Sequence, residues 1–377
     1  MRWRKWSAVA IMALMASGAG YAHAAKTIWS DDESSLAMYG DVRFRHETDS
    51  VVSDGKEDQN RDRDRLRLRL GLKYKANEVV SLGARLATEA DDDHSTNHNF
   101  GMLKGGAPES AFGLDKAFIK VDLKPVWMWV GKNSNHTWDA TGLTWDSDLI
   151  PEGVAMGGEF GDGYKAKIYA GYYIINETLY DEKDDTMLAY QAIFKYGKAY
   201  SIKAAVGGYS VSDQNPSEGE DAFPIPGGTA SYQHAMVELG GKDLPLSPII
   251  GTQFVSSNVD ISTHIGEGGK EADRQSMVVY VKVEPGPVEA MFSVWDVGYA
   301  GATALGEFNA DDFDKTGNFT GWVVSVKGKI YKALSVQAKY FYQEVKNDAI
   351  KPPYAGGAQL GKGNKRTRMQ LNFVVKF

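Results

Sequence analysis

One ten-residue stretch with strictly alternating charged and apolar side chains decides the fold class. It reads Arg65-Leu66-Arg67-Leu68-Arg69-Leu70-Gly71-Leu72-Lys73-Tyr74. A β-strand separates these two sets onto its two faces, because successive side chains point to opposite sides. An α-helix would scatter both sets around its circumference. The stretch therefore predicts a strand with an apolar face and a basic face.

The same two-residue period recurs along the rest of the chain. In each case apolar side chains occupy one face, and Lys, Arg or small polar side chains occupy the other. The clearest further strands are expected at Leu36–His46, Val80–Thr88, Tyr164–Ile174, Tyr200–Val206, Met277–Val283, Trp322–Lys327 and Arg366–Phe377. The expected fourth, fifth, tenth and eleventh strands are poorly patterned.

The connections between these strands alternate between short turns and long polar loops. Long loops are expected near residues 49–62, 90–112, 134–152, 176–185, 211–229, 257–273, 300–317 and 347–364. With seven short turns between them, these eight loops make fifteen connections and hence about sixteen strands. Short turns at one end and long loops at the other are the layout of an outer-membrane barrel.

We therefore expect an all-β fold, a transmembrane antiparallel β-barrel with short periplasmic turns and long extracellular loops. Such a barrel satisfies its backbone within lipid although no long apolar segment follows the first residues. A soluble β-sandwich or propeller would alternate too. The basic polar faces, the alternating loop lengths and a final strand that ends on Phe377 favour the barrel. Phe377 is interpreted as an assembly signal.

Residues 1–24 have the pattern of a secretory signal peptide. Three basic residues precede a short apolar run, Ala8–Ala16, and Ala22-His23-Ala24 has the form of a cleavage site. The apolar run is too short for the alternative, a membrane anchor. Cleavage before Ala25 would leave residues 25–377 as the barrel and change the formal charge from −7 to −10. An acidic chain does not suggest a nucleic-acid partner.

Four segments resemble the "putative porin" family of Gram-negative bacteria. They are Tyr39–Arg45, Arg65–Leu72, Gly83–Thr88 and the segment Trp145–Ala155, which begins Trp-Asp-Ser-Asp. The resemblance implies a porin-type barrel in the outer membrane, in contact with lipid and lipopolysaccharide. It also implies a homotrimer that passes small polar solutes and has no catalytic residues. It does not name a solute.

The inward faces of the last strand and the first three strands are expected to form one basic wall. Strands lie roughly 4.8 Å apart and residues of one face roughly 7 Å apart, so the cationic groups would be dense. They are Arg43, Arg45, Arg65, Arg67, Arg69, Lys73, Arg85, Arg366 and Arg368. A wall of this kind would attract anionic or zwitterionic solutes into a pore. The alternative is that the arginines pair with Asp41, Glu47 and Glu89 and serve only barrel stability.

The third long loop, Asn133–Gly153, is the candidate for a constriction. In well-studied porins this loop folds inward, and by that resemblance Asp139, Asp146, Asp148 and Glu152 would face the basic wall. Opposed charges produce a transverse field that favours polar solutes. The alternative is an ordinary extracellular loop. Trp138 and Trp145 would pin the loop to the wall or stack on sugars.

Aromatic side chains near strand ends are expected to form girdles at the membrane interfaces. Tyr74, Trp127, Trp129, Tyr172 and Trp322 are the candidates.

No enzyme motif, cofactor motif or metal-ligand spacing is present in the sequence. The chain is therefore expected to be a non-enzymatic channel without cofactors or metal ions. A second hypothesis, a non-conducting barrel that acts as an adhesin or as the scaffold of an outer-membrane complex, stays open.

Overall fold

The computed structural model describes residues 25–53, 56–88, 96–100, 112–177, 184–212, 229–259, 274–298, 317–331, 333–346 and 363–377. The predicted signal peptide, residues 1–24, lies outside the described residues. The described part of the chain contains no helix of the length and apolarity that crossing a membrane requires.

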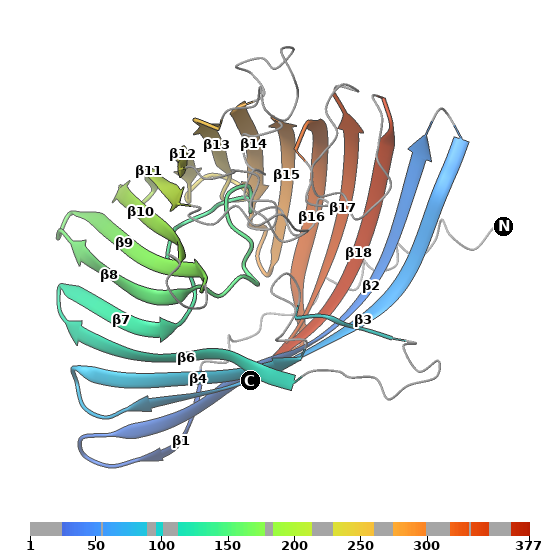
Figure 1. The fold of residues 1–377 in the computed structure, drawn as a ribbon. Coiled ribbons are helices and arrows are strands. Elements are labelled where there is room, and N and C mark those ends of the chain that lie inside the picture. The colour runs from blue at the N-terminus through green and yellow to red at the C-terminus, as the bar shows by residue number, and fades with distance from the viewer. Residues whose placement is uncertain are drawn as a thin grey trace.

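Within the described residues, sixteen strands close into one antiparallel barrel, as predicted (Figure 1). Two shorter strands, β1 (Lys26–Ser30) and β5 (His98–Asn99), pair with β2 and β3. The barrel strands are β2 (Ser35–Ser53), β3 (Lys56–Lys75), β4 (Val80–Thr88), β6 (Phe112–Leu123), β7 (Val126–Lys132), β8 (Glu152–Phe160), β9 (Tyr164–Asn176), β10 (Asp185–Tyr196), β11 (Tyr200–Ser212), β12 (Thr229–Gly241), β13 (Ile249–Ser257), β14 (Gln275–Val283), β15 (Val288–Val297), β16 (Phe319–Tyr331), β17 (Leu334–Val345) and β18 (Lys365–Lys376).

Pairing of β18 with β2 closes the barrel. The register runs from Lys365 opposite Val52 to Lys376 opposite Asp41, and Phe373 lies opposite Phe44. This pairing places the last strand beside the arginine-rich β2 and β3. It therefore joins the four inward faces that the sequence assigned to one wall.

The prediction of a long loop at residues 49–62 is wrong. β2 continues to Ser53 and β3 begins at Lys56, so the two strands have 19 and 20 residues and take up most of the expected loop. The polar composition of this segment suggested a loop. In the structure its inward carboxylates, such as Asp49, pair with arginines of β18, so a charged sequence extends the strands.

The leucine face of β3 points outward and its arginine face points inward. Leu70 and Leu72 are 37% and 44% exposed, whereas Arg65 and Arg67 are 8% and 6% exposed. Large apolar side chains are likewise exposed at alternate positions of other strands, such as Val279 and Val281. The outer surface is therefore the apolar band that a lipid bilayer requires.

Two of the five candidates for the interfacial girdles are placed differently. On β7, Val126, Met128 and Val130 take the outer face, so Trp127 and Trp129 point inward. Alternation on a short strand, rather than aromatic character, decides the direction. Trp322 points outward, and its ring centroid lies 5.5 Å from that of Tyr340.

Candidate functional site: the charged constriction of the lumen

The segment between β7 and β8, residues 133–151, lies inside the barrel (Figure 1). The backbone of Trp138 is held on β10, where its N–H donates to Gln191 Oε1 (2.6 Å) and its carbonyl accepts from Gln191 Nε2 (2.8 Å). Thr141 Oγ1 donates to Gln253 Oε1 of β13 (2.7 Å). These contacts fix the first half of the loop against the inner wall.

Tryptophan and leucine side chains add apolar anchors to the same wall. Trp145 stacks on Tyr209 of β11 with ring centroids 5.6 Å apart. Leu143 is 1% exposed and packs in one cluster with Val255 and Val278. Of the two roles expected for the loop tryptophans, these contacts favour pinning the loop to the wall over stacking on sugars, because Trp145 is buried.

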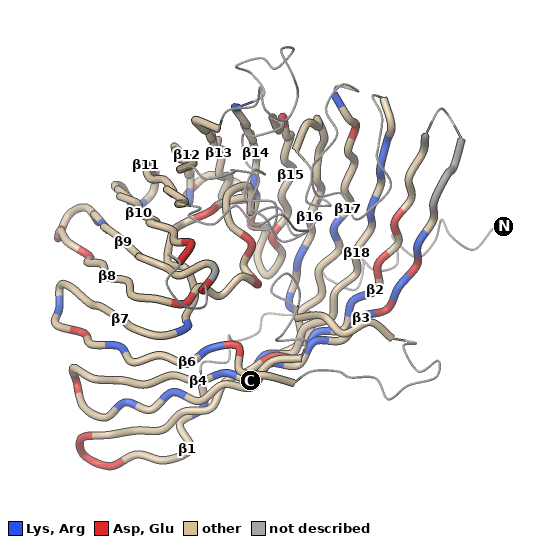
Figure 2. The backbone as a smooth tube through the Cα atoms, viewed as in Figure 1, with Lys and Arg blue, Asp and Glu red and all other residues tan. Residues whose placement is uncertain are grey.

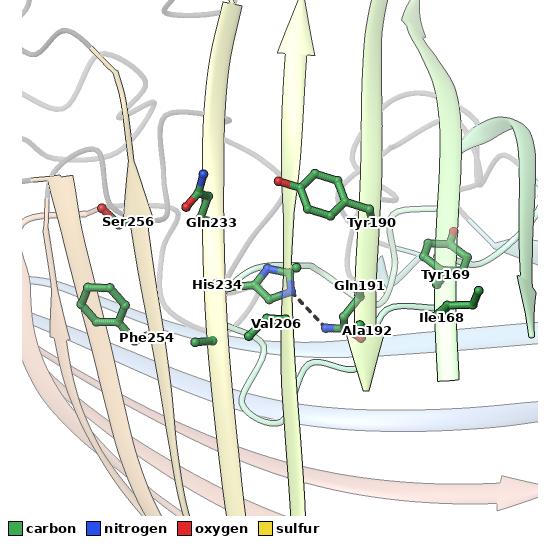
Figure 3. Close-up of a pocket in the computed structure, with 12 residues that line it drawn as sticks. Ile168, Tyr169, Tyr190, Gln191, Ala192, Val206, Gln233, His234, Phe254 and Ser256 are labelled. Carbon is green, nitrogen blue, oxygen red and sulfur yellow. Dashed lines mark hydrogen bonds between the residues drawn. The ribbon is translucent and has the colours of Figure 1, made fainter. Parts of the chain in front are cut away.

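Gln191 is held in turn by His234 of β12, whose Nε2 lies 3.0 Å from Gln191 Nε2 (Figure 3). A hollow of about 670 Å³ beside this pair is lined largely by Tyr190, Val206, Phe254 and other outward-facing side chains. It therefore belongs to the outer face of the barrel and not to the lumen.

Asp139 organises the loop from within. Its carboxylate accepts hydrogen bonds from the backbone N–H groups of Thr141 (3.1 Å), Gly142 (2.8 Å), Thr144 (2.8 Å) and Trp145 (3.0 Å). These bonds replace the hydrogen bonds that an irregular backbone cannot make with itself. The Asp139 carboxylate thus serves the shape of the loop and does not face the basic wall.

Asp148 is the loop carboxylate that meets the arginines. Its oxygens lie 3.3 Å from Arg67 Nη1, 3.7 Å from Arg69 Nη1 and 4.0 Å from Arg43 Nη2. Asp146 supports this placement, because its Oδ1 accepts a hydrogen bond from the N–H of Asp148 (2.7 Å). Both aspartates are buried. The loop therefore reaches from β10 and β13 to β2 and β3, across the lumen.

Glu152, the remaining constriction candidate, lies apart from the other three. It is the first residue of β8, and its 63% exposed side chain pairs with Lys132 of β7 at 2.8 Å.

The arginines on β2 and β3 are held by carboxylates of β2. Asp41 accepts from Arg67 Nη2 (2.8 Å) and from Arg69 Nε (2.7 Å). Glu47 accepts from Arg63 Nε (2.5 Å) and from Gln370 Nε2 of β18 (2.9 Å). The forked guanidinium and the two-oxygen carboxylate suit such bridges.

Two further carboxylates complete the pairing. Asp49 accepts from Arg366 Nε (2.7 Å) and from Arg368 Nη2 (2.8 Å) of β18. Asp115 of β6 pairs with Arg85 of β4. Sequence reasoning missed Asp49 because it fell in an expected loop, and missed Asp115 because a register shift interrupts the β4–β6 pairing.

The remaining members of the predicted wall lie on the same face. Arg43 Nε donates to Asn97 Oδ1 (3.2 Å), and Arg45 Nε donates to Asn372 Oδ1 (2.7 Å). Arg65 is buried beside them, and Lys73 is exposed toward the end of β3. All nine predicted cationic residues are therefore on adjoining strands.

Positive charge predominates on this wall even though much of it is paired. In the part of the chain that the structure describes, the nine cations are joined by Arg63 and face the four wall carboxylates Asp41, Glu47, Asp49 and Asp115. Figure 2 shows the basic residues gathered on β18, β2 and β3. The arginines therefore stabilise the barrel and also leave a net positive surface.

Aromatic rings cover the wall next to the basic one. The ring centroid of His136, in the loop, lies 4.9 Å from that of Trp127 and 5.9 Å from that of Tyr169. Lys120 Nζ sits 5.4 Å from the centroid of Trp127. Burial lowers the pKa of His136, so this ring adds no charge at neutral pH. The loop is thereby anchored by neutral contacts here and by charged ones at Asp148.

The described residues contain no group of three or more His, Cys, Asp or Glu side chains able to hold a metal ion.

The closed barrel, its apolar exterior and its charged lumen define an outer-membrane porin-type channel. Residues 53–175 match the model of the family described as "Putative porin". None of the curated proteins matches the chain.

Solved porins share the fold. Salmonella typhi OmpF in complex with daunomycin aligns with a TM-score of 0.57 at 12% identity, covering 93% of this chain and 100% of that one. The anion-selective porin from Comamonas acidovorans aligns with a TM-score of 0.54 at 12% identity, covering 92% and 100%. OmpT of Vibrio cholerae aligns with a TM-score of 0.51 at 12% identity, covering 93% and 100%. At this identity the likeness concerns the fold alone.

Proposed function

We propose that the protein is a passive diffusion channel for small polar solutes whose basic wall favours anionic or zwitterionic ones. The observation that carries the proposal is the position of Asp148 of the loop against Arg43, Arg67 and Arg69. A loop carboxylate held directly against a guanidinium-rich wall leaves positive charge on that wall beside the loop, and this asymmetry creates a transverse field in the lumen. Polar solutes can orient in such a field, whereas apolar ones gain nothing from it.

The preference for anions follows from the balance of charge on the wall. Arginine stays protonated at any physiological pH, and the nine predicted cations outnumber the carboxylates among them in the described residues. The Comamonas acidovorans porin, whose fold is similar, is described as anion-selective. Asp148 reduces the positive potential locally, so the preference should be moderate.

The proposed location and assembly of the channel are those of an outer-membrane porin. Residues 1–24 would direct export as a cleaved signal peptide, and residues 25–377 would form the barrel in contact with lipid and lipopolysaccharide. Vibrio cholerae OmpT, a structural neighbour with a TM-score of 0.50, is described in a trimer form. We therefore expect a homotrimer here.

The test is conductance of the purified protein in planar bilayers. We expect stepwise currents, and we expect liposomes that contain the protein to admit small polar solutes. A barrel that serves as an adhesin or scaffold would give neither result, and that outcome would overturn the proposal.

The basic wall is tested separately by reversing charges. In the double variant Arg67→Glu, Arg69→Glu the reversal potential in a KCl gradient should move toward cations, because two wall charges change sign. Lys165→Gln is the control, since Lys165 lies on β9 and pairs with Glu159 (2.9 Å). An unchanged reversal potential in the double variant would contradict the role of the wall.

A further inference from the structure

A second, smaller cavity lies on the basic wall toward the short-turn end of the barrel. Its volume is about 240 Å³, and its lining includes Tyr39 of β2, Arg69 of β3, Arg85 of β4 and Lys376 of β18. Asp41 is the one carboxylate side chain that lines it. The cavity is thus lined by three cations, by the Asp41 side chain, by Tyr39 and by Phe377, the last residue, which carries the terminal carboxylate.

The Asp41 side chain of this cavity is already engaged by arginines. Asp41 accepts from Arg67 at 2.8 Å and from Arg69 at 2.7 Å, and it is 6% exposed. Its charge is therefore neutralised within the wall. The donors left to face the cavity are those of Arg85 and Lys376.

Two of the cations retain donors for a further partner. In the described part of the chain, Arg85 pairs with Asp115 through Nε, and Lys376 lines the cavity with an exposed side chain. The terminal guanidinium nitrogens of Arg85 and the Lys376 ammonium are thus able to bind an anion. A carboxylate is suited to this arrangement, because its two oxygens can take one donor from each.

Tyr39 provides a flat surface beside these donors. A Cβ atom at Gly71 would lie 2.3 Å from the Tyr39 ring, so the ring lies over the glycine of the neighbouring strand. Any side chain at position 71 would lift this ring away from the wall. A planar group can therefore stack on the tyrosine while its anionic end meets Arg85 and Lys376.

Resting on the proposed pore function, we infer that this cavity is a binding subsite for small planar carboxylates. It lies next to the Asp148 contact, because Arg69 takes part in both. An anion that moves toward the short-turn end would thus bind at the subsite after it passes the constriction. An anion that enters from the short-turn end would bind there first.

Benzoate is the probe, and the chloride current of the full-length protein in a planar bilayer is the readout. Benzoate in both chambers should reduce the current with a saturable dependence on concentration. Acetate, which lacks the ring, should block at roughly severalfold higher concentration, as the energy of ring stacking suggests.

Two variants separate the contributions. Lys376→Gln should raise the half-blocking concentration of both acids about tenfold, the effect of one charged hydrogen bond. Tyr39→Leu should raise the half-blocking concentration of benzoate and leave that of acetate unchanged. Lys195→Gln is the matched control, because this exposed lysine lies inward on β10 outside the cavity. Lys376 is exposed, so its replacement leaves a folded channel even if Tyr39→Leu does not fold.

Absence of saturable block in a channel that still prefers anions would overturn the subsite and leave the proposed function intact. An equal loss of block in Lys195→Gln would also overturn it, because the effect would then be general electrostatics. Loss of anion preference in the unmodified protein would instead overturn the proposed function.

Discussion

At the scale of single residues, Asp148 combines two opposite effects on the pore. It holds the loop to Arg67 and Arg69, and it lowers the positive potential next to them. We expect Asp148→Asn to increase anion preference, because one negative charge leaves the wall while the cations stay. Reversal potentials of the two channels check this.

The control for that variant is Glu152→Gln. Glu152 lies on β8 and pairs with Lys132 instead of the arginine wall. Its replacement should leave the reversal potential within error of the unmodified protein. A shift in Glu152→Gln as large as that in Asp148→Asn would contradict the assignment of the loop carboxylates.

Residue-scale reasoning from sequence reached the arginines but not all of their partners. The Leu/Arg alternation alone places Arg65, Arg67 and Arg69 on one face. It cannot tell whether Asp139 or Asp148 turns toward them, because both lie in an irregular segment. That choice depends on hydrogen bonds to loop backbone, which follow no period in the sequence.

At the scale of elements, the inner loop is held by Asp139 and by Thr141. Asp139→Ala removes the acceptor of four backbone N–H groups, each bond contributing about 1 kcal/mol. We expect the loop to detach from the wall, with higher conductance and faster protease cleavage within residues 133–151. Asp139→Asn, which keeps one acceptor oxygen, should show a smaller effect.

Thr141→Val tests the other end of the anchor. It removes the hydrogen bond to Gln253 (2.7 Å) and conserves the volume of the side chain. Conductance noise from loop motion should rise while the mean current changes little. Conductance and protease sensitivity that stay unchanged in both Asp139→Ala and Thr141→Val would show that the loop is not held as described.

Strands with a clear period were predictable, and elements decided by tertiary context were not. β18 and the Arg65–Tyr74 part of β3 follow from alternation alone. The ends of β2 and β3 that lie within residues 49–62 did not follow from it, because their charged residues are typical of loops. These residues form strands because Arg366 and Arg368 of β18 pair with carboxylates there. Trp127 and Trp129 were misassigned because aromatic character says less about direction than the apolar residues that alternate with them.

At the scale of the whole molecule, the basic wall is a property of closure. It exists because β18 meets β2, which brings the arginines of both ends of the chain together. The preference that this surface produces should depend on salt. The Debye length falls from about 10 Å at 0.1 M to about 3 Å at 1 M ionic strength, so anion preference should be strong in dilute KCl and weak near 1 M.

A series of reversal potentials at a constant gradient and increasing mean concentration measures this dependence. A preference that is independent of salt would point to pore size or to a single tight site in place of the surface charge.

The reversal potential of the unmodified protein in a dilute KCl gradient tests the central claim most directly. A lumen lined by the arginines of β18, β2 and β3 predicts stepwise currents whose reversal potential lies on the chloride side of zero. Currents that reverse on the potassium side, or the absence of stepwise currents from folded protein, would contradict the account.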